Sequence, residues 1–270
     1  MKFFVSLLKT SIKASVSKRG AFLTESSLMI ANNLIFLTIW WIFFRQFHDV
    51  GGWQFYDMVV LMAVGTGGYG LMNVCFGGIK MLSTMIINGD LDPFMTQPKN
   101  LLLHIAGSRS NVKGWGNLMT AAILVMIAGI TNLFFLFMIL LSILCAGVIY
   151  ASFNTIAHSL PFWMGSVEVL SKKYCDALFL FAVYPTNIYS GLLQVVMFTL
   201  IPAGIISYLP VELIRDFTWL NFFFLIASSL GFLLLAFFIF YSNSSSHHPY
   251  PDFKIFFYQI KKIFSQNIWS

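Results

Sequence analysis

Charged residues are scarce in this chain of 270 residues, because Asp, Glu, Lys and Arg together make up only 10% of it. Soluble globular domains carry about 25% charged residues. Hydrophobic residues reach 58%, and 30 of them are phenylalanine. The shortage of charge excludes an ordinary soluble domain and predicts an all-α integral membrane protein.

Cysteine is also scarce, and the usual metal and nucleotide motifs are missing. Cys75, Cys145 and Cys175 are scattered without a CxxC spacing, which favours free thiols over a disulfide framework or a zinc site. Neither a GxxxxGK[ST] loop nor an HExxH or GxSxG motif occurs. We therefore expect no metal, no cofactor and no catalytic site, and any energy from ATP would have to come from a partner.

The formal charge of +6 does not indicate nucleic-acid binding, since the basic residues are spread between apolar runs. Their distribution instead orients the chain in a membrane. Fourteen Lys and Arg fall on one side of the predicted spans, and only Arg45 and Arg215 fall on the other. This asymmetry places both termini and the Lys80–Lys113 loop in the cytoplasm.

Six membrane spans are predicted from runs without charge. The run Ser26–Phe44 has 19 residues, about 28 Å as a helix, which is enough to cross a bilayer core. The run Gly114–Val167 has 54 residues, roughly 80 Å if helical, so it must fold back near Asn132. The predicted spans of a single transmembrane domain, residues 1–241, cover residues 26–44, 58–79, 114–131, 133–158, 177–200 and 217–241.

Prolines interrupt the run before the last span. Residues 177–211 would measure about 52 Å as one helix, and the run contains Pro185, Pro202 and Pro210. We expect a span followed by a broken or re-entrant helix, whose backbone must be sheltered by protein or water.

Both ends of the chain have amphipathic patterns. Residues 1–19 alternate apolar and basic positions at helical spacing, which is typical of a helix on the membrane surface. A signal peptide is the competing interpretation, but Lys9 and Lys13 interrupt its apolar segment. The tail, residues 242–270, carries Phe253, Phe257 and Phe264 on one face of a possible second surface helix.

Two groups of residues imitate functional motifs. Gly65–Gly70 matches GxGxxG and resembles a potassium-channel filter, but small residues inside a span also allow close helix packing, which we favour. His158, Glu168 and Asp176 are residue types common in catalytic sites, although their position at the ends of spans explains them more simply. An ATPase-independent transporter or channel and, further behind, an intramembrane enzyme remain alternatives.

Three ordered segments resemble one family of transporters. They are Gly89-x-Leu91-Asp92 followed by Pro98, Ser159–Trp163, and Tyr184-Pro185 followed by Ile201–Ala203 and Tyr208–Pro210. Together they are similar to the type-two class of ATP-binding-cassette (ABC) export permeases, in the uncharacterised six-span branch. The resemblance covers roughly residues 1–241 and departs at the longer C-terminal tail.

The resemblance implies a permease subunit in a bacterial inner membrane, among membrane lipids, that forms a homodimer or heterodimer and is driven by ABC ATPase subunits in trans. Its cargo would be a lipid, a lipid-linked molecule, a peptide or an amphipathic drug-like compound. A cytoplasmic coupling helix between spans two and three would fit a groove on the ATPase. Its residues would be Ile86, Ile87, Gly89, Asp90, Leu91, Asp92 and Pro98.

Within that segment, Leu91 and the two isoleucines would be apolar anchors, whereas the aspartates would cap the helix or pair with basic residues. Gly89 and the prolines would fix the turn. The alternative is an interfacial helix that only connects two spans.

Overall fold

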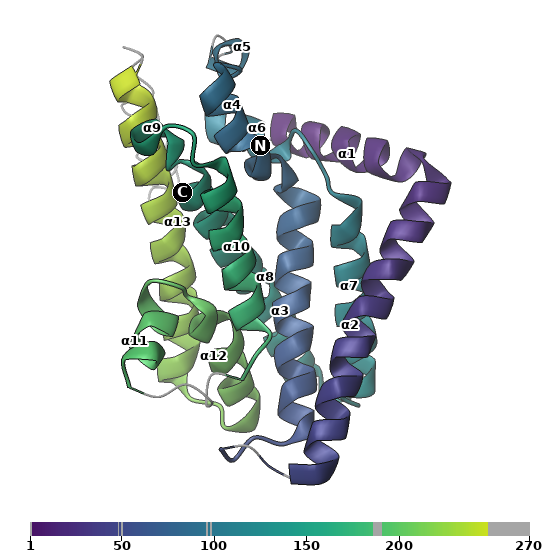
Figure 1. Ribbon diagram of the computed structural model, residues 1–270. Coiled ribbons are helices and arrows are strands. Elements are labelled where there is room, and N and C mark those ends of the chain that lie inside the picture. Colours follow the sequence, from purple (N-terminus) through teal and green to yellow (C-terminus); the bar gives the residue numbers. More distant parts are fainter. Residues whose placement is uncertain are drawn as a thin grey trace, which may run out of the picture.

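The computed structural model describes residues 2–47, 49, 51–95, 97, 99–185 and 191–247, and these residues form helices and connecting turns without strands. Figure 1 shows long helices running side by side, with short helices at both ends of the bundle. The helices are α1 (Lys2–Ser17), α2 (Arg19–Phe47), α3 (Phe55–Cys75), the 3-10 helix η1 (Gly77–Met81), α4 (Leu82–Asn88), α5 (Asp92–Met95), α6 (Leu101–Gly107), α7 (Val112–Ile127), α8 (Leu133–His158), α9 (Pro161–Met164), α10 (Glu168–Ala182), α11 (Leu192–Thr199), α12 (Ala203–Arg215) and α13 (Trp219–His247).

Among the described residues, four helical segments are long and apolar enough to cross a membrane: α2, α3, the run Leu133–Met164 formed by α8 and α9, and α13. Helix α7 is a shorter apolar helix of 16 residues. The prediction of an all-helical membrane protein is therefore confirmed, whereas the division into six spans stays a prediction.

Near Asn132 the chain passes from α7 to α8, and the Asn132 side chain caps α8 by accepting a hydrogen bond from the Phe134 amide at 2.9 Å. The preceding span was predicted to reach residue 131, but α7 ends at Ile127. Gly129 lies just beyond with φ of 64°, a left-handed conformation that glycine adopts without steric cost and that ends the helix.

Two other predicted spans are wrong in their bounds. Helix α3 ends at Cys75 instead of residue 79, and the chain tightens into η1, where Gly78 lies against the Ile105 carbonyl. The predicted span 177–200 is not one helix, since α10 runs from Glu168 to Ala182 and α11 is separate. Pro185 explains this end, because proline disfavours the helical conformation of the residue before it.

Helix α3 lies at the centre of the bundle, and 83% of the residues in its most apolar stretch are buried. Its glycines allow neighbouring helices to approach closely. A Cβ atom added to Gly68 would lie 2.5 Å from the Ala146 Cβ on α8, and one on Gly70 would lie 2.8 Å from the Gly114 carbonyl oxygen on α7. The close-packing interpretation of Gly65–Gly70 is thereby confirmed, because the segment is continuous α-helix.

The segment between α10 and α13 folds into two short helices, α11 and α12, at the end of the bundle opposite α4 (Figure 1). Pro185 follows α10 and Pro202 precedes α12, so both lie where helices are interrupted. Pro210 lies inside α12 and does not break it. The burial of its neighbours Leu209 and Val211 offsets the hydrogen bond that proline cannot donate.

Helix α1 crosses the end of the bundle at a steep angle to α2 (Figure 1). One face of α1 packs on α6, where the Phe3 ring lies edge-on to the His104 ring, with the ring centroids 5.1 Å apart. The Lys99 ammonium lies 3.8 Å from the Phe3 ring centroid. The predicted surface helix is therefore a helix with one face on α6, and its location at a membrane surface stays a prediction.

Candidate functional site

Helices α4 and α5 project from one end of the bundle (Figure 1). Helix α4 follows η1 directly and ends at Gly89, whose φ of 76° is left-handed. The amide of Asp90 then donates to the Met85 carbonyl at 2.9 Å, which closes the helix end. Glycine is needed here because other residues adopt this conformation at a cost.

The coupling residues predicted from the sequence do not share one environment. Ile87 is 40% exposed, and Gly89 and Asp90 are also exposed. Ile86 is partly buried against neighbouring apolar side chains. Asp92 begins α5, and Pro98 lies outside the described residues. We call the segment α4–α5 the tip. Of the predicted coupling residues, Ile87, Gly89 and Asp90 lie on its outer surface.

Leu91 faces the interior of its own chain and is only 7% exposed. It belongs to a buried group that we call the Leu91 cluster, whose members are Leu82, Leu91, Leu101, Leu102, Ile105, Phe240 and Tyr241. The cluster joins α4 and α6 to the end of α13. The turn after Gly89 thus directs the Leu91 side chain inward in this conformation, and its role as an anchor for a partner stays a prediction.

Two polar contacts attach the short helix α4 to α8 and α10. The Ser83 hydroxyl lies 2.7 Å from His158 Nδ1, at the end of α8, and both side chains are buried. The Glu168 carboxylate, at the start of α10, pairs with Lys172 at 2.5 Å and is also hydrogen-bonded by Thr84. The hydrogen bonds from Lys172 and then from Thr84 lower the pKa of Glu168.

These contacts give His158 and Glu168 a structural explanation. Both residues hold α4 against the bundle, and the described residues contain no group of His, Cys, Asp and Glu that could hold a metal ion. Ser83 and Thr84 were missed by sequence reasoning. No motif marks them, since an isolated hydroxyl residue in a short helix predicts no particular partner.

Most of the chain matches a known protein family. The model of the ABC-2 family transporter proteins matches residues 28–247. The chain belongs to the ABC-2 transporter family. No curated protein matches it. The family resemblance inferred from Gly89–Pro98 and the two other segments is confirmed, and so is a multi-pass membrane permease. Permeases of this family are generally the non-catalytic membrane component of a transporter.

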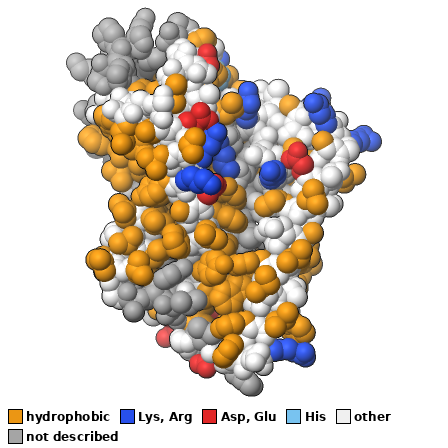
Figure 2. Space-filling model, in the orientation of Figure 1, with side chains coloured by type: hydrophobic (Ala, Val, Ile, Leu, Met, Phe, Trp, Pro, Cys, Tyr) orange, Lys and Arg blue, Asp and Glu red, His pale blue; other side chains and the backbone are white. Residues whose placement is uncertain are grey.

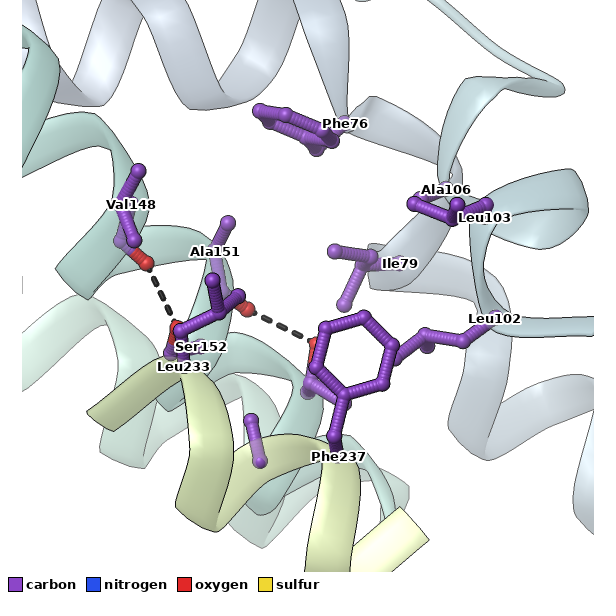
Figure 3. A pocket seen from close by; sticks show the side chains of 12 residues that line it. Phe76, Ile79, Leu102, Leu103, Ala106, Val148, Ala151, Ser152, Leu233 and Phe237 are labelled. Atoms are coloured by element: carbon purple, nitrogen blue, oxygen red, sulfur yellow. Dashed lines mark hydrogen bonds between the residues drawn. The ribbon is translucent and has the colours of Figure 1, made fainter. Parts of the chain in front are cut away.

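A small apolar cavity lies between η1, α6, α8 and α13 of this permease (Figure 3). Its volume is about 60 Å³, far below the about 300–1,000 Å³ of ligand pockets. Ser152 and Thr155 lie on its wall, but their hydroxyls donate to Val148 and Ala151 of their own helix. The cavity is therefore a packing gap next to the Leu91 cluster and cannot hold cargo.

A second, polar pocket of about 210 Å³ opens between α3, η1, α8 and α10. It is lined by Lys80 and Lys172, together with His158 and Asp176, which are two of the three residues of the predicted enzyme-like group. The permease thus carries charged groups beside its central helix, near the level at which α3 ends.

Proposed function

We propose that the chain is the membrane-spanning subunit of an ABC-type exporter and that ATP is hydrolysed by a separate ATPase subunit. Membership of the ABC-2 transporter family carries this proposal. The absence of a P-loop supports it, because a permease of this kind would need a partner that binds ATP. The exposed tip formed by α4 and α5 supplies a contact for such a partner.

We further propose that the tip lies on the cytoplasmic side of a bacterial inner membrane, together with both termini. The start of α1, the tip and the end of α13 lie at the same end of the bundle (Figure 1). Among the described residues, nearly all Lys and Arg outside the spans belong to segments at this end, which agrees with the excess of Lys and Arg in cytoplasmic loops. The permease would act as a dimer with itself or with a sister chain.

An ATPase would contact the tip at Ile87 and Asp90, and three connections of α4 would transmit the resulting displacement to other helices. Ser83 passes it to α8, Thr84 passes it to α10, and η1 passes it to α3. The Leu91 cluster adds a fourth connection, to α13. Interior packing transmits displacement because close-packed side chains have little room to yield.

Replacing Ile87 tests this proposal at the surface of the tip. Ile87→Asp would place a charge in an apolar contact and should reduce co-purification with a co-expressed ABC ATPase by at least about thirtyfold. ATP hydrolysis by the complex should fall with it. Because the side chain is 40% exposed, the permease itself should keep its stability.

The matched control is Ile87→Leu, which keeps the apolar character and should keep the complex. If wild-type permease binds no ATPase under any condition, the proposed function is wrong. If Ile87→Asp binds the ATPase as tightly as Ile87→Leu does, the function stands but the contact lies elsewhere.

A further inference from the structure

The polar pocket between α3, η1, α8 and α10 combines two ammonium groups with an unpaired amide oxygen, that of Asn154. Figure 2 shows basic and acidic side chains gathered over the end of α10 nearest α4, directly above a broad hydrophobic surface. Lys80, Lys172 and Asp176 line the pocket, and Lys80 lies just beyond the end of α3. In a membrane, charged groups at the end of a spanning helix lie at the level of the lipid headgroups.

Lys80 is positioned but not neutralised. Its ammonium lies 3.0 Å from the Tyr69 hydroxyl and 4.7 Å from the Tyr69 ring centroid. Tyr69 is itself held by stacking on Phe179 at 4.2 Å. Among the residues that the structure describes, no carboxylate forms an ion pair with Lys80. A fixed ammonium without a counter-ion is a site for an anion.

Asn154 presents a hydrogen-bond acceptor to the same pocket, whereas Lys80 presents a cationic donor. Its side chain is fully buried, and its Nδ2 donates to the Tyr150 carbonyl at 2.8 Å, which fixes the orientation of the amide. The Oδ1 atom has no hydrogen-bond partner. A buried acceptor left unpaired is unfavourable, so a ligand that donates to Oδ1 would gain free energy. The Asp176 carboxylate, also on the wall, attracts a cationic donor.

The volume of about 210 Å³ restricts the ligand. Pockets that enclose a whole drug-sized molecule measure about 300–1,000 Å³, so this one fits a compact polar group while the rest of the molecule stays outside. The adjacent hydrophobic surface (Figure 2) would contact acyl chains.

We propose that this pocket binds the headgroup of a zwitterionic phospholipid in which the phosphate is followed by a primary amine. The phosphate oxygens would accept hydrogen bonds from the ammonium groups of Lys80 and Lys172, although Lys172 is shared with Glu168. The primary ammonium would donate to Asn154 Oδ1 and pair with Asp176. Binding of the headgroup requires neither ATP nor an ATPase, so it is separate from the proposed function.

The test uses the full-length chain purified in detergent without any ATPase, with bound lipid counted by native mass spectrometry. Short-chain phosphatidylethanolamine should bind at least about tenfold more tightly than short-chain phosphatidylglycerol, which has the phosphate without the amine. Lys80→Gln should weaken phosphatidylethanolamine binding by about tenfold or more. Lys173→Gln is the matched control, because Lys173 lies on the same end of α10 but not on the pocket wall, and it should bind like the wild type.

Asp176→Asn should remove the preference for phosphatidylethanolamine and leave phosphatidylglycerol binding unchanged. The proposal is overturned if Lys80→Gln and Lys172→Gln both bind phosphatidylethanolamine like the wild type. Inorganic phosphate distinguishes the source of the anion: if it displaces the lipid at equal concentration, the pocket is a free-phosphate site and the lipid assignment is wrong. Equal binding of both lipids, unchanged by Asp176→Asn, would refute the amine part.

Discussion

Single residues at the end opposite the tip determine how the α2–α3 loop is fixed. Asp57, in the first turn of α3, has a side chain that is 5% exposed and pairs with Arg215 of α12 at 2.9 Å. Its carboxylate also accepts the Gln54 amide at 2.8 Å, and Arg215 donates to the Gly52 carbonyl. One buried carboxylate thus joins a helix start, a loop and the end of α12.

Removing this charge should loosen that end of the molecule. Asp57→Asn keeps the shape but loses the charged hydrogen bonds, so we expect about 1–3 kcal/mol of lost stability. An apparent Tm in detergent that is lower than that of the wild type by several degrees would record it.

Arg45→Gln is the comparison, because Arg45 only covers the Trp41 ring, at 4.3 Å from its centroid, and such exposed contacts contribute about 0.5–1 kcal/mol. A double-mutant cycle of Asp57→Asn with Arg215→Gln should show coupling. An Asp57→Asn protein as stable as Arg45→Gln would contradict the assigned role.

At the scale of elements, the sequence predicted those features that local chemistry determines. Charge-free runs located α2, α8 and α13, and the fold-back expected near Asn132 agrees with the start of α8 at Leu133. The Asn132 cap that fixes this start acts within its own turn. The end of α3 and the extent of α10 were not predictable in this way. They depend on Gly78 meeting the Ile105 carbonyl and on Glu168 meeting Thr84, and both are contacts between segments distant in sequence.

The candidate site shows the same division. Gly89 was predicted as the turn because its left-handed conformation is a local property. The burial of Leu91 was missed because its neighbours Phe240 and Tyr241 lie about 150 residues away in the chain. Sequence pattern gives the position of the tip, but only tertiary packing decides which of its apolar residues face outward.

The close approach of α3 and α8 makes a prediction about helix packing. In Gly68→Ala the new Cβ would lie 2.5 Å from the Ala146 Cβ and 3.0 Å from the Gly147 amide nitrogen. The two helices would have to separate, at a cost of about 1–3 kcal/mol. Thermal unfolding in detergent and the yield of folded protein should both decrease.

Gly231→Ala serves as the matched control, since Gly231 lies inside α13 with nothing within 4 Å of an added Cβ. Alanine favours a helix by about 0.5–1 kcal/mol over glycine, so this variant should be as stable as the wild type or more so. Equal unfolding temperatures for Gly68→Ala and Gly231→Ala would show that α3 and α8 do not depend on the missing side chain.

At the scale of the whole molecule, the α4–α5 tip is attached to several helices at once, so it can move without them only if these attachments break. Helix α4 is tied to α8 by Ser83, to α10 by Thr84 and to α13 by the Leu91 cluster. If an ATPase moves the tip, α8 and α10 should therefore move with it. The attachments and the outer contact at Ile87 involve different residues, which allows binding and transmission to be separated by mutation.

The double variant Ser83→Ala with Thr84→Val should bind the ATPase normally, because the exposed surface of the tip is unchanged, but should transmit less of its movement. Nitroxide labels on Val169→Cys, 72% exposed at the start of α10, and Leu23→Cys, 64% exposed on α2, would report the movement of α10 relative to α2 with and without ATP. We expect an ATP-dependent change in the wild-type background that shrinks by at least about half when these two hydrogen bonds, each contributing about 0.5–1.5 kcal/mol, are removed. Thr10→Ala, which removes an exposed hydroxyl bonded only within α1, should leave the change intact. A full distance change in the double variant would mean that movement reaches α10 through η1 or the Leu91 cluster, and not through Ser83 and Thr84.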